Sequence, residues 1–173
     1  SGVLALNVGP NAVEVLVTAQ AGTTTKAYNV NVVRAVSAAG DVKPDFNPDV
    51  DGLVRSIAPQ KDGKIIVGGE FTSVGGIERN HIARLNADGT LDPSFNPGVG
   101  SAVHSAAVQS DGAIVIGGNF FTVAGASQSR VARLNLDGTL DPAFDPSVNG
   151  MVHGMMLQPD GKIVIAGLFG TVG

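Results

Sequence analysis

The 173-residue chain contains no cysteine, and only 15% of its residues are charged. Without cysteine it has no disulfide, no thiolate zinc site and no cysteine nucleophile. No apolar run approaches the ~20 residues of a membrane-spanning helix, so we expect no membrane insertion. The net charge is −4, and the 11 basic residues are dispersed. The sequence therefore offers no basic patch for nucleic acid or for an anionic membrane surface.

Hydrophobic residues make up 43% of the chain, which is too many for a disordered protein. The length suggests one or two domains with a substantial core. The first residues lack the basic-then-apolar pattern of a signal peptide. We therefore expect that any export signal lies upstream or is absent.

A repeat with a period of 49 residues runs through residues 41–173. Asp-Gly pairs, phenylalanines and an arginine recur at this spacing without a gap. These positions are Asp62, Gly63, Asp111, Gly112, Asp160 and Gly161; Phe46, Phe95 and Phe144; Phe71, Phe120 and Phe169; and Arg84 and Arg133. A period of this size is typical of solenoids, propellers and arrays of supersecondary units.

The pattern within one repeat predicts short strands. Residues 54–60 form the first, and Asp62-Gly63 provides a tight turn because both residues tolerate positive φ. Residues 64–69 form the second strand, whose continuous β-branched run indicates that both of its faces are covered. A loop around Gly75-Gly76 leads to a third strand at 81–86, and a short fourth follows at 90–91. No window has the periodicity of a helix.

Four short antiparallel strands per unit, with strands covered on both faces, are typical of a β-propeller blade. The units run 42–90, 91–139 and 140–173, the last one incomplete. A ring usually needs ~4–8 blades. We therefore expect an incomplete ring, belonging to a fragment, to part of a longer chain, or to a protomer completed by its neighbours.

Residues 1–35 carry a different pattern. Strands are predicted at 3–8, 12–18 and 26–33, separated by glycine, proline and asparagine. Three strands cover only one side of a core, so this segment is predicted to be part of a β-sandwich. The small, uncharged residues 36–40 are interpreted as a linker. The fold class is thus all-β, with a partial sandwich followed by propeller-type blades.

Two motifs in residues 41–173 resemble a known repeat. Asp-Gly-Lys-Ile-Ile-Val-Gly-Gly-Glu-Phe-Thr-Ser-Val-Gly-Gly is followed by Ala-Arg-Leu-Asn-Ala-Asp-Gly-Thr-Leu-Asp-Pro-Ser-Phe-Asn-Pro-Gly. Together they resemble the delta-sixty repeat, a propeller-type repeat of large bacterial secreted or surface proteins. Ala113 departs from the lysine at Lys64 and Lys162, and Leu168 from a polar position. The resemblance implies the propeller fold but no general activity.

The N-terminal segment has a resemblance of its own. Leu6-Asn7-Val8-Gly9-Pro10-Asn11 and Tyr28-Asn29-Val30-Asn31-Val32-Val33 resemble the C-terminal part of the bacterial cadherin-like β-sandwich module. Ala21 replaces the acidic residue usual before the turn glycine, which weakens the case for a calcium-assisted turn. The resemblance implies that the first half of this sandwich is missing from the chain.

Candidate sites are few. His104 and His153 share one repeat position, which Arg55 occupies in the first unit. If the first strands line a channel, these residues could form a ring that binds an anion or a metal. Sharing one metal at ~2 Å per ligand is difficult across a blade spacing, so a solvated or hydrogen-bonded channel lining is the preferred interpretation.

The acidic residues Asp41, Asp45, Asp49 and Asp51 are close enough in sequence to suit calcium, with Asp45, Asp49 and Asp51 as the candidates. They lack the glycine and the final glutamate of an EF-hand loop, so a solvated turn is preferred and no metal or cofactor is expected.

Two further sets of recurring residues, the arginines and the phenylalanines, are predicted to stabilise the fold rather than to bind a ligand. Arg84 and Arg133 recur with aspartates (Asp88 and Asp137, Asp92 and Asp141), which predicts a charge-assisted contact in each blade; ligand binding is the alternative. The recurring phenylalanines are predicted to pack blade against blade rather than to form an aromatic ligand platform. Gly68-Gly69 and Gly117-Gly118 precede no helix, which excludes a phosphate cradle.

No catalytic residue is assigned. The preferred hypothesis is a non-enzymatic, extracellular structural or adhesive protein of a bacterium, which assembles by strand or blade completion into a filament or surface layer. The alternative is a carbohydrate- or protein-binding propeller that uses exposed loops, and a propeller-borne hydrolase is the third hypothesis. The expected partners are copies of this chain, the rest of a longer chain, or surface glycans.

Overall fold

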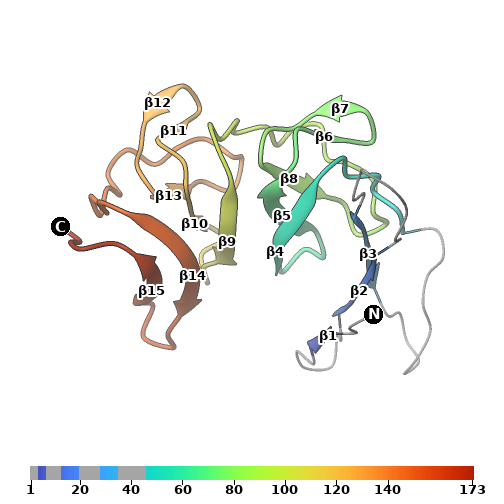
Figure 1. Ribbon diagram of the computed structural model, residues 1–173, viewed down its shortest axis with the longest axis horizontal. Coiled ribbons are helices and arrows are strands. Elements are labelled where there is room, and N and C mark those ends of the chain that lie inside the picture. Colours follow the sequence, from blue (N-terminus) through green and yellow to red (C-terminus); the bar gives the residue numbers. More distant parts are fainter. Residues whose placement is uncertain (1–3, 7–12, 20–27, 35–45) are drawn as a thin grey trace.

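The computed structural model describes residues 4–6, 13–19, 28–34 and 46–173, and every regular element among them is a strand (Figure 1). The all-β prediction is confirmed. None of the described residues lies in a helix that is long and apolar enough to cross a membrane.

The N-terminal strands form one antiparallel sheet in the order β1-β2-β3. They are β1 (Leu4–Leu6), β2 (Val13–Ala19) and β3 (Tyr28–Arg34). The three predicted strands are thus present. A second sheet facing this one is not found among the described residues, so the sandwich remains a prediction. The predicted linker at 36–40, with Asp41 and Asp45, lies outside the described part of the chain.

The first two repeat units each contain a three-stranded antiparallel sheet. In the first unit the order is β4 (Leu53–Pro59), β5 (Ile65–Glu70) and β8 (Ile82–Leu85). In the second it is β9 (Val103–Val108), β10 (Ile114–Gly118) and β13 (Val131–Leu134). The third unit contains the pair β14 (Met151–Leu157) and β15 (Ile163–Leu168).

The prediction of a fourth strand at 90–91 is wrong. The chain makes only one antiparallel bridge there, between Leu85 and Leu91, and its counterpart in the second unit joins Leu134 to Leu140. The prolines that follow, Pro93 and Pro142, have no N–H to extend the ladder. The main sheets of the first two units are therefore three-stranded.

The predicted loop around Gly75-Gly76 is a small hairpin instead. It joins β6 (Ser73–Val74) to β7 (Ile77–Glu78), and the second unit has the matching pair β11 (Thr122–Val123) and β12 (Ala126–Ser127). Gly75 and Gly76 have φ of 58° and 72°. Two consecutive positive φ values are what a two-residue hairpin turn of type I′ requires.

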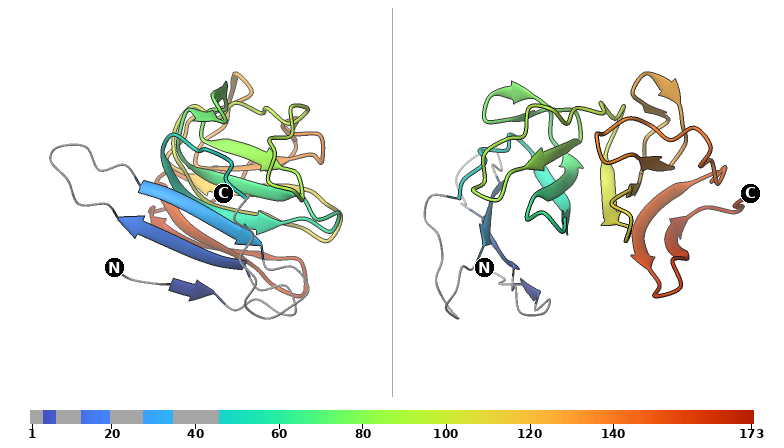
Figure 2. Two further views of the ribbon diagram at one scale, coloured as in Figure 1. Left: turned by 90° about the vertical axis from the view of Figure 1, so that its right-hand side faces the viewer. Right: turned by 180° about the vertical axis from the view of Figure 1, so that it is seen from behind.

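The units pack face to face, with the innermost strands β4, β9 and β14 side by side in that order (Figures 1 and 2). Ile66 and Ile82 of the first unit share one buried cluster with Phe95, Ile114 and Phe120 of the second. A second cluster joins the second and third units in the same way. These two cores therefore lie between units, whereas a third cluster, which includes Phe46, Val67 and Phe71, lies within the first unit. The second strands of the first two units contribute to a cluster on each face, which explains why they are apolar on both faces.

A side-chain hydrogen bond reinforces each of these interfaces. The hydroxyl of Ser56 accepts the N–H of Ala106 at 2.8 Å, and the hydroxyl of Ser105 accepts the N–H of Met155 at 3.1 Å. Both bonds span 50 residues, so each joins the serine position of one unit to the following repeat position of the next unit. Gly154 stands where the third unit would have the serine.

Candidate functional site

Arg55, His104 and His153 occupy a β-bulge on the innermost strand of their units. In the first unit Val54 pairs with Gly69 and Ser56 with Gly68, so Arg55 has no partner in the ladder. The register shifts in the same way at the two histidines. Bulges redirect a side chain out of the regular alternation and are frequent beside functional sites.

The glycine opposite each bulge (Gly69, Gly118 and Gly167) makes this geometry feasible. A Cβ on Gly69 would lie 1.9 Å from the carbonyl oxygen of Leu53, and a Cβ on Gly118 would lie 2.1 Å from that of Ala102. Both distances are far inside van der Waals contact. Any residue other than glycine would push the innermost strand away from its neighbour.

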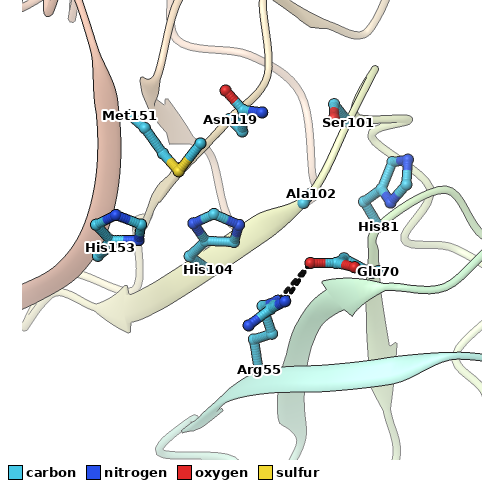
Figure 3. A pocket seen from close by; sticks show the side chains of 9 residues that line it. All are labelled: Arg55, Glu70, His81, Ser101, Ala102, His104, Asn119, Met151 and His153. Atoms are coloured by element: carbon cyan, nitrogen blue, oxygen red, sulfur yellow. Dashed lines mark hydrogen bonds and ion pairs between the residues drawn. The ribbon is translucent and has the colours of Figure 1, made fainter. Parts of the chain in front are cut away.

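The bulged side chains meet in an open pocket of about 580 Å³ (Figure 3). Its lining comes from all three units: Arg55, Glu70, His81, Ser101, Ala102, His104, Asn119, Met151 and His153. A second space of about 300 Å³ is bordered by Leu53, Val54 and three of the same residues, Arg55, His104 and His153. Figure 3 shows the side chains of the first unit on one side and those of the later units on the other.

The charges in the pocket are paired. The Nε of Arg55 donates to the Oε1 of Glu70 at 2.6 Å, across half-exposed side chains. On the opposite wall, Arg130 donates to the Oδ1 of Asn119 and lies over the ring of Phe121, 3.9 Å from its centroid. The Asn119 amide is thereby oriented, with its NH₂ group as the remaining donor.

His104 is held by its backbone surroundings. Its Nδ1 lies 3.1 Å from the carbonyl oxygen of Val152, which can only accept, so Nδ1 carries the proton. Burial lowers the pKa of His104 below its usual value; the hydrogen bond to Val152 opposes this shift, and the charge of Arg55 adds to it. At neutral pH the ring is therefore neutral, and Nε2 is an acceptor.

The predicted ring of Arg55, His104 and His153 is brought together, but the two imidazoles stack rather than converge. Their centroids are 5.5 Å apart and their planes differ by 4°. No group of three or more histidines, aspartates or glutamates that could hold a metal occurs in the described part of the chain. The geometry is that of a polar pocket lining.

Comparisons with known proteins address the repeat itself. The family model described as "Domain of unknown function (DUF5122) beta-propeller" matches residues 60–95, 109–144 and 158–173, which together make up half of the chain. The chain belongs to the DUF5122 beta-propeller family. No curated protein and no solved structure matches it significantly.

The three DUF5122 segments begin just before each Asp-Gly turn and include the second strand of each unit. The first two also include the third strand, together with its arginine and the Asp-Pro segment after it. The all-β sheets and the family agree that these units are β-propeller repeats. The family's description assigns no function, so function must be argued from the site.

In the first DUF5122 unit, the recurring arginine lies at the interface with the second. Arg84 is buried and donates from Nε to the Oδ2 of Asp92 at 2.8 Å. It also donates to the carbonyl oxygen of Leu136 in the second unit at 2.5 Å and lies over the ring of Phe95. Asp88 instead accepts from Thr90 in its own turn.

The second arginine has fewer partners. Arg133 reaches the Oδ2 of Asp141 at 2.6 Å and lies over Phe144. Its side chain is 31% exposed, compared with 7% for Arg84. Asp137 accepts from Thr139, as Asp88 does from Thr90. Each of these arginine partners lies in the unit that follows its arginine, so the recurring arginine joins consecutive units.

Of the calcium candidates, Asp49 and Asp51 are described, and Asp51 supports a turn. Its carboxylate accepts the N–H groups of Thr72 and Ser73 at 2.9 Å each and the hydroxyl of Thr72 at 2.7 Å. In the third unit Asn149 accepts from the equivalent N–H groups, those of Gly170 and Thr171. A neutral amide accepts the same backbone N–H groups there, so these hydrogen bonds do not require a carboxylate.

Replacing Asp51 tests this assignment. Burial would raise the pKa of Asp51, but the hydrogen bonds from Ser73 and Thr72 outweigh it and lower the pKa to about 2. This stabilisation is complete above the unfolded pKa of about 3.8 and is lost as the pH falls through about 2. We expect Asp51→Ala to lower the free energy of unfolding at pH 7 by about 1 kcal/mol, because the site is exposed.

Asp51→Asn is the matched variant, because it introduces the side chain that Asn149 has at this position of the third unit. It keeps the acceptor, so urea unfolding at pH 7 should give nearly the wild-type free energy, with less loss between pH 4 and pH 2. Equal losses for the Ala and Asn variants at pH 7 would show that charge matters at this position, as a cation site requires.

Proposed function

We propose that this DUF5122 chain is a non-enzymatic structural or adhesive protein, located outside a bacterial cell, that assembles by completion of its third unit. The main support is an apolar surface on that unit, here called the forward face. In each unit this is the face that packs against the following unit, and in the third it consists of Met156 and Val164.

The forward face of the third unit is exposed where the earlier units are buried. Val164 is 43% exposed, whereas Ile66 and Val115 at the same repeat position are fully buried. Met156 is 59% exposed, whereas Ala58 at its repeat position is 5% exposed. Contiguous exposed apolar residues are typical of an interaction surface.

The edge of the same sheet adds a second element. Among the described residues β15 pairs only with β14, whereas β5 and β10 have strands on both sides. Free N–H and C=O groups on a sheet edge are a template for another strand. Beside them lies a largely apolar pocket of about 470 Å³ whose lining includes Val131, Phe144, Ile163 and Ile165. A strand like β8 or β13 suits this edge and this pocket.

The third forward face also differs from the other two. Gly154 replaces the serine that accepts a hydrogen bond from the next unit. Ala166 replaces Gly68 and Gly117, where a Cβ would lie 2.6–2.8 Å from a valine methyl of the next unit. A partner on this face therefore meets a different surface from the one buried between the described units.

The type of repeat and the type of N-terminal module are part of the same proposal. We propose that the units are delta-sixty-type blades, completed to four strands in the assembly, and that residues 1–35 belong to a cadherin-like sandwich. Both resemblances support an extracellular location. Protease treatment of intact source cells tests this: an extracellular protein is digested without lysis, and a protein that is protected until lysis contradicts the location.

Self-association is the direct test. We expect the purified chain to form concentration-dependent oligomers, measured by light scattering after size exclusion and by electron microscopy. Val164→Glu should shift the population to monomers, because it places a charge in the apolar contact. Ile77→Glu is the matched control, since Ile77 is 52% exposed but lies on β7, away from this face.

The assembly proposal fails if the wild-type chain stays monomeric across the concentration range. It also fails if Ile77→Glu reduces association as much as Val164→Glu, because the effect would then follow surface hydrophobicity in general. Thermal unfolding of both variants shows whether either substitution affects the fold itself.

A further inference from the structure

The pocket at the innermost strands gathers all three histidines of the chain, His81, His104 and His153. They come from three different units and two different repeat positions. The Asp-Gly turns and the phenylalanines, which build the fold, hold the same residue from unit to unit. The pocket positions vary instead: Arg55 becomes histidine, and Glu70 becomes asparagine and then Leu168. The fold does not dictate these side chains.

Charge balance limits what the pocket can hold. Arg55 and Glu70 are the formal charges in the lining, and they neutralise each other. His104 is neutral at neutral pH. A bound anion would lie beside the Glu70 carboxylate, and the lining has no unpaired positive group to offset it. A bound cation would lie beside Arg55, and the lining has no unpaired negative group to offset it. Bringing an unpaired charge into such a site is unfavourable.

The hydrogen-bonding groups are mixed in kind. His104 presents Nε2 as an acceptor, and Glu70 uses Oε1 for Arg55, which leaves its second oxygen to accept. Asn119 presents its NH₂ group as a donor, and Ser101 can both donate and accept. A ligand with hydroxyl groups matches this set, because each hydroxyl donates one hydrogen bond and accepts others. A purely apolar ligand would leave these groups unpaired.

The pocket also has a less polar side. The stacked rings of His104 and His153 lie beside the side chain of Met151, opposite the Arg55–Glu70 pair (Figure 3). The C–H face of a sugar ring packs against surfaces of this kind, while its hydroxyls reach the polar wall. The volume of about 580 Å³ falls within the range of ~300–1,000 Å³ usual for small-molecule sites.

We propose that this pocket binds an uncharged saccharide, with Glu70, His104 and Asn119 as hydrogen-bonding residues and His153 and Met151 as the packing surface. The site lies on the bulges of the innermost strands, away from the forward face of the third unit. It does not depend on assembly, so either proposal can fail without the other.

The experiment uses the full chain and an array of neutral oligosaccharides (glucans, mannans, galactans and xylans) with sialylated and sulfated glycans beside them, at pH 7.5. The best neutral binder is then titrated calorimetrically against variants. We expect His153→Ala and Glu70→Gln each to weaken binding at least 10-fold. Leu168→Ala is the matched control. Leu168 occupies the repeat position of Glu70 in the third unit but does not line the pocket, so this variant should bind the oligosaccharide as the wild type does.

Glu70→Gln has a second readout. It removes the negative partner of Arg55 and leaves the lining with a net positive charge, so binding of the sulfated glycans should increase. The proposal is overturned if no neutral oligosaccharide binds, if only acidic glycans bind to the wild type, or if His153→Ala and Leu168→Ala bind equally. Circular dichroism of each variant distinguishes a lost contact from a lost fold.

Discussion

Replacing Asp92 with alanine is expected to lower the free energy of unfolding by about 3 kcal/mol. Asp92 is 4% exposed and accepts hydrogen bonds from Arg84, Lys64 and Ser94. Burial would raise its pKa, but these hydrogen bonds hold the pKa well below its usual range. Alanine would leave the guanidinium of Arg84 buried without its counter-ion.

The repeat provides a matched control in Asp141→Ala. Asp141 pairs with Arg133 as Asp92 pairs with Arg84, but the Arg133 side chain is 31% exposed and reaches water. The loss of stability should therefore be much smaller. Guanidinium unfolding of both variants measures the difference, and equal losses would contradict the role given to burial.

A double variant separates charge from packing. Arg84→Met combined with Asp92→Ala removes the unpaired charge and keeps an apolar side chain between the units. We expect it to recover part of the stability lost in Asp92→Ala, because replacing both members of a buried pair is often close to neutral. A double variant that is less stable than Asp92→Ala would show that the arginine acts mainly through Leu136 and Phe95.

Phe120→Ala is expected to be the other most damaging substitution, with a loss of about 3–5 kcal/mol. Phe120 is fully buried in the cluster between the first and second units, together with Phe95, Ile114 and Ile116. Alanine would leave a cavity that the rigid strands on both sides cannot close. The melting temperature should fall by roughly 10 °C.

Phe169→Ala is the control for Phe120→Ala. Phe169 occupies the same repeat position in the third unit but is only partly buried. Its truncation should lower the melting temperature by less than half as much in differential scanning calorimetry. Equal shifts would mean that the position matters for a reason other than packing between units.

Local patterns were sufficient to predict the strands. The predicted ranges 54–60, 64–69 and 81–86 correspond to β4, β5 and β8, because Asp-Gly turns and continuous β-branched runs define them within a few residues. The same holds for β1 to β3. The fourth strand was overpredicted, because the Asp-Pro that follows residue 91 limits pairing to one bridge.

The features that build the pocket depend on pairing between distant residues. The bulges at Arg55, His104 and His153 arise from the register against the facing strand of each unit, which no local pattern reveals. His104 and His153 could be related by the repeat, but Glu70, Asn119 and His81 lie on other strands and join them only when the sheet forms. The hairpins of β6–β7 and β11–β12 have strands of two residues, too short for alternation to be visible. Gly75-Gly76 was the signal that could have indicated the first.

The hydrogen bond between Ser56 and Ala106 bears on how such a chain grows. Its acceptor and its donor occupy two different positions of the same repeat, so a duplicated unit carries both halves. Ser105 and Met155 show the result: the second unit donates one bond to the first unit and accepts the next from the third. Duplication of a unit therefore supplies both partners of this hydrogen bond in one genetic step. A single substitution, such as the glycine at 154, removes the acceptor for the following unit but leaves the bond to the preceding unit in place. The two faces of such a unit then differ in the hydrogen bonds they can form.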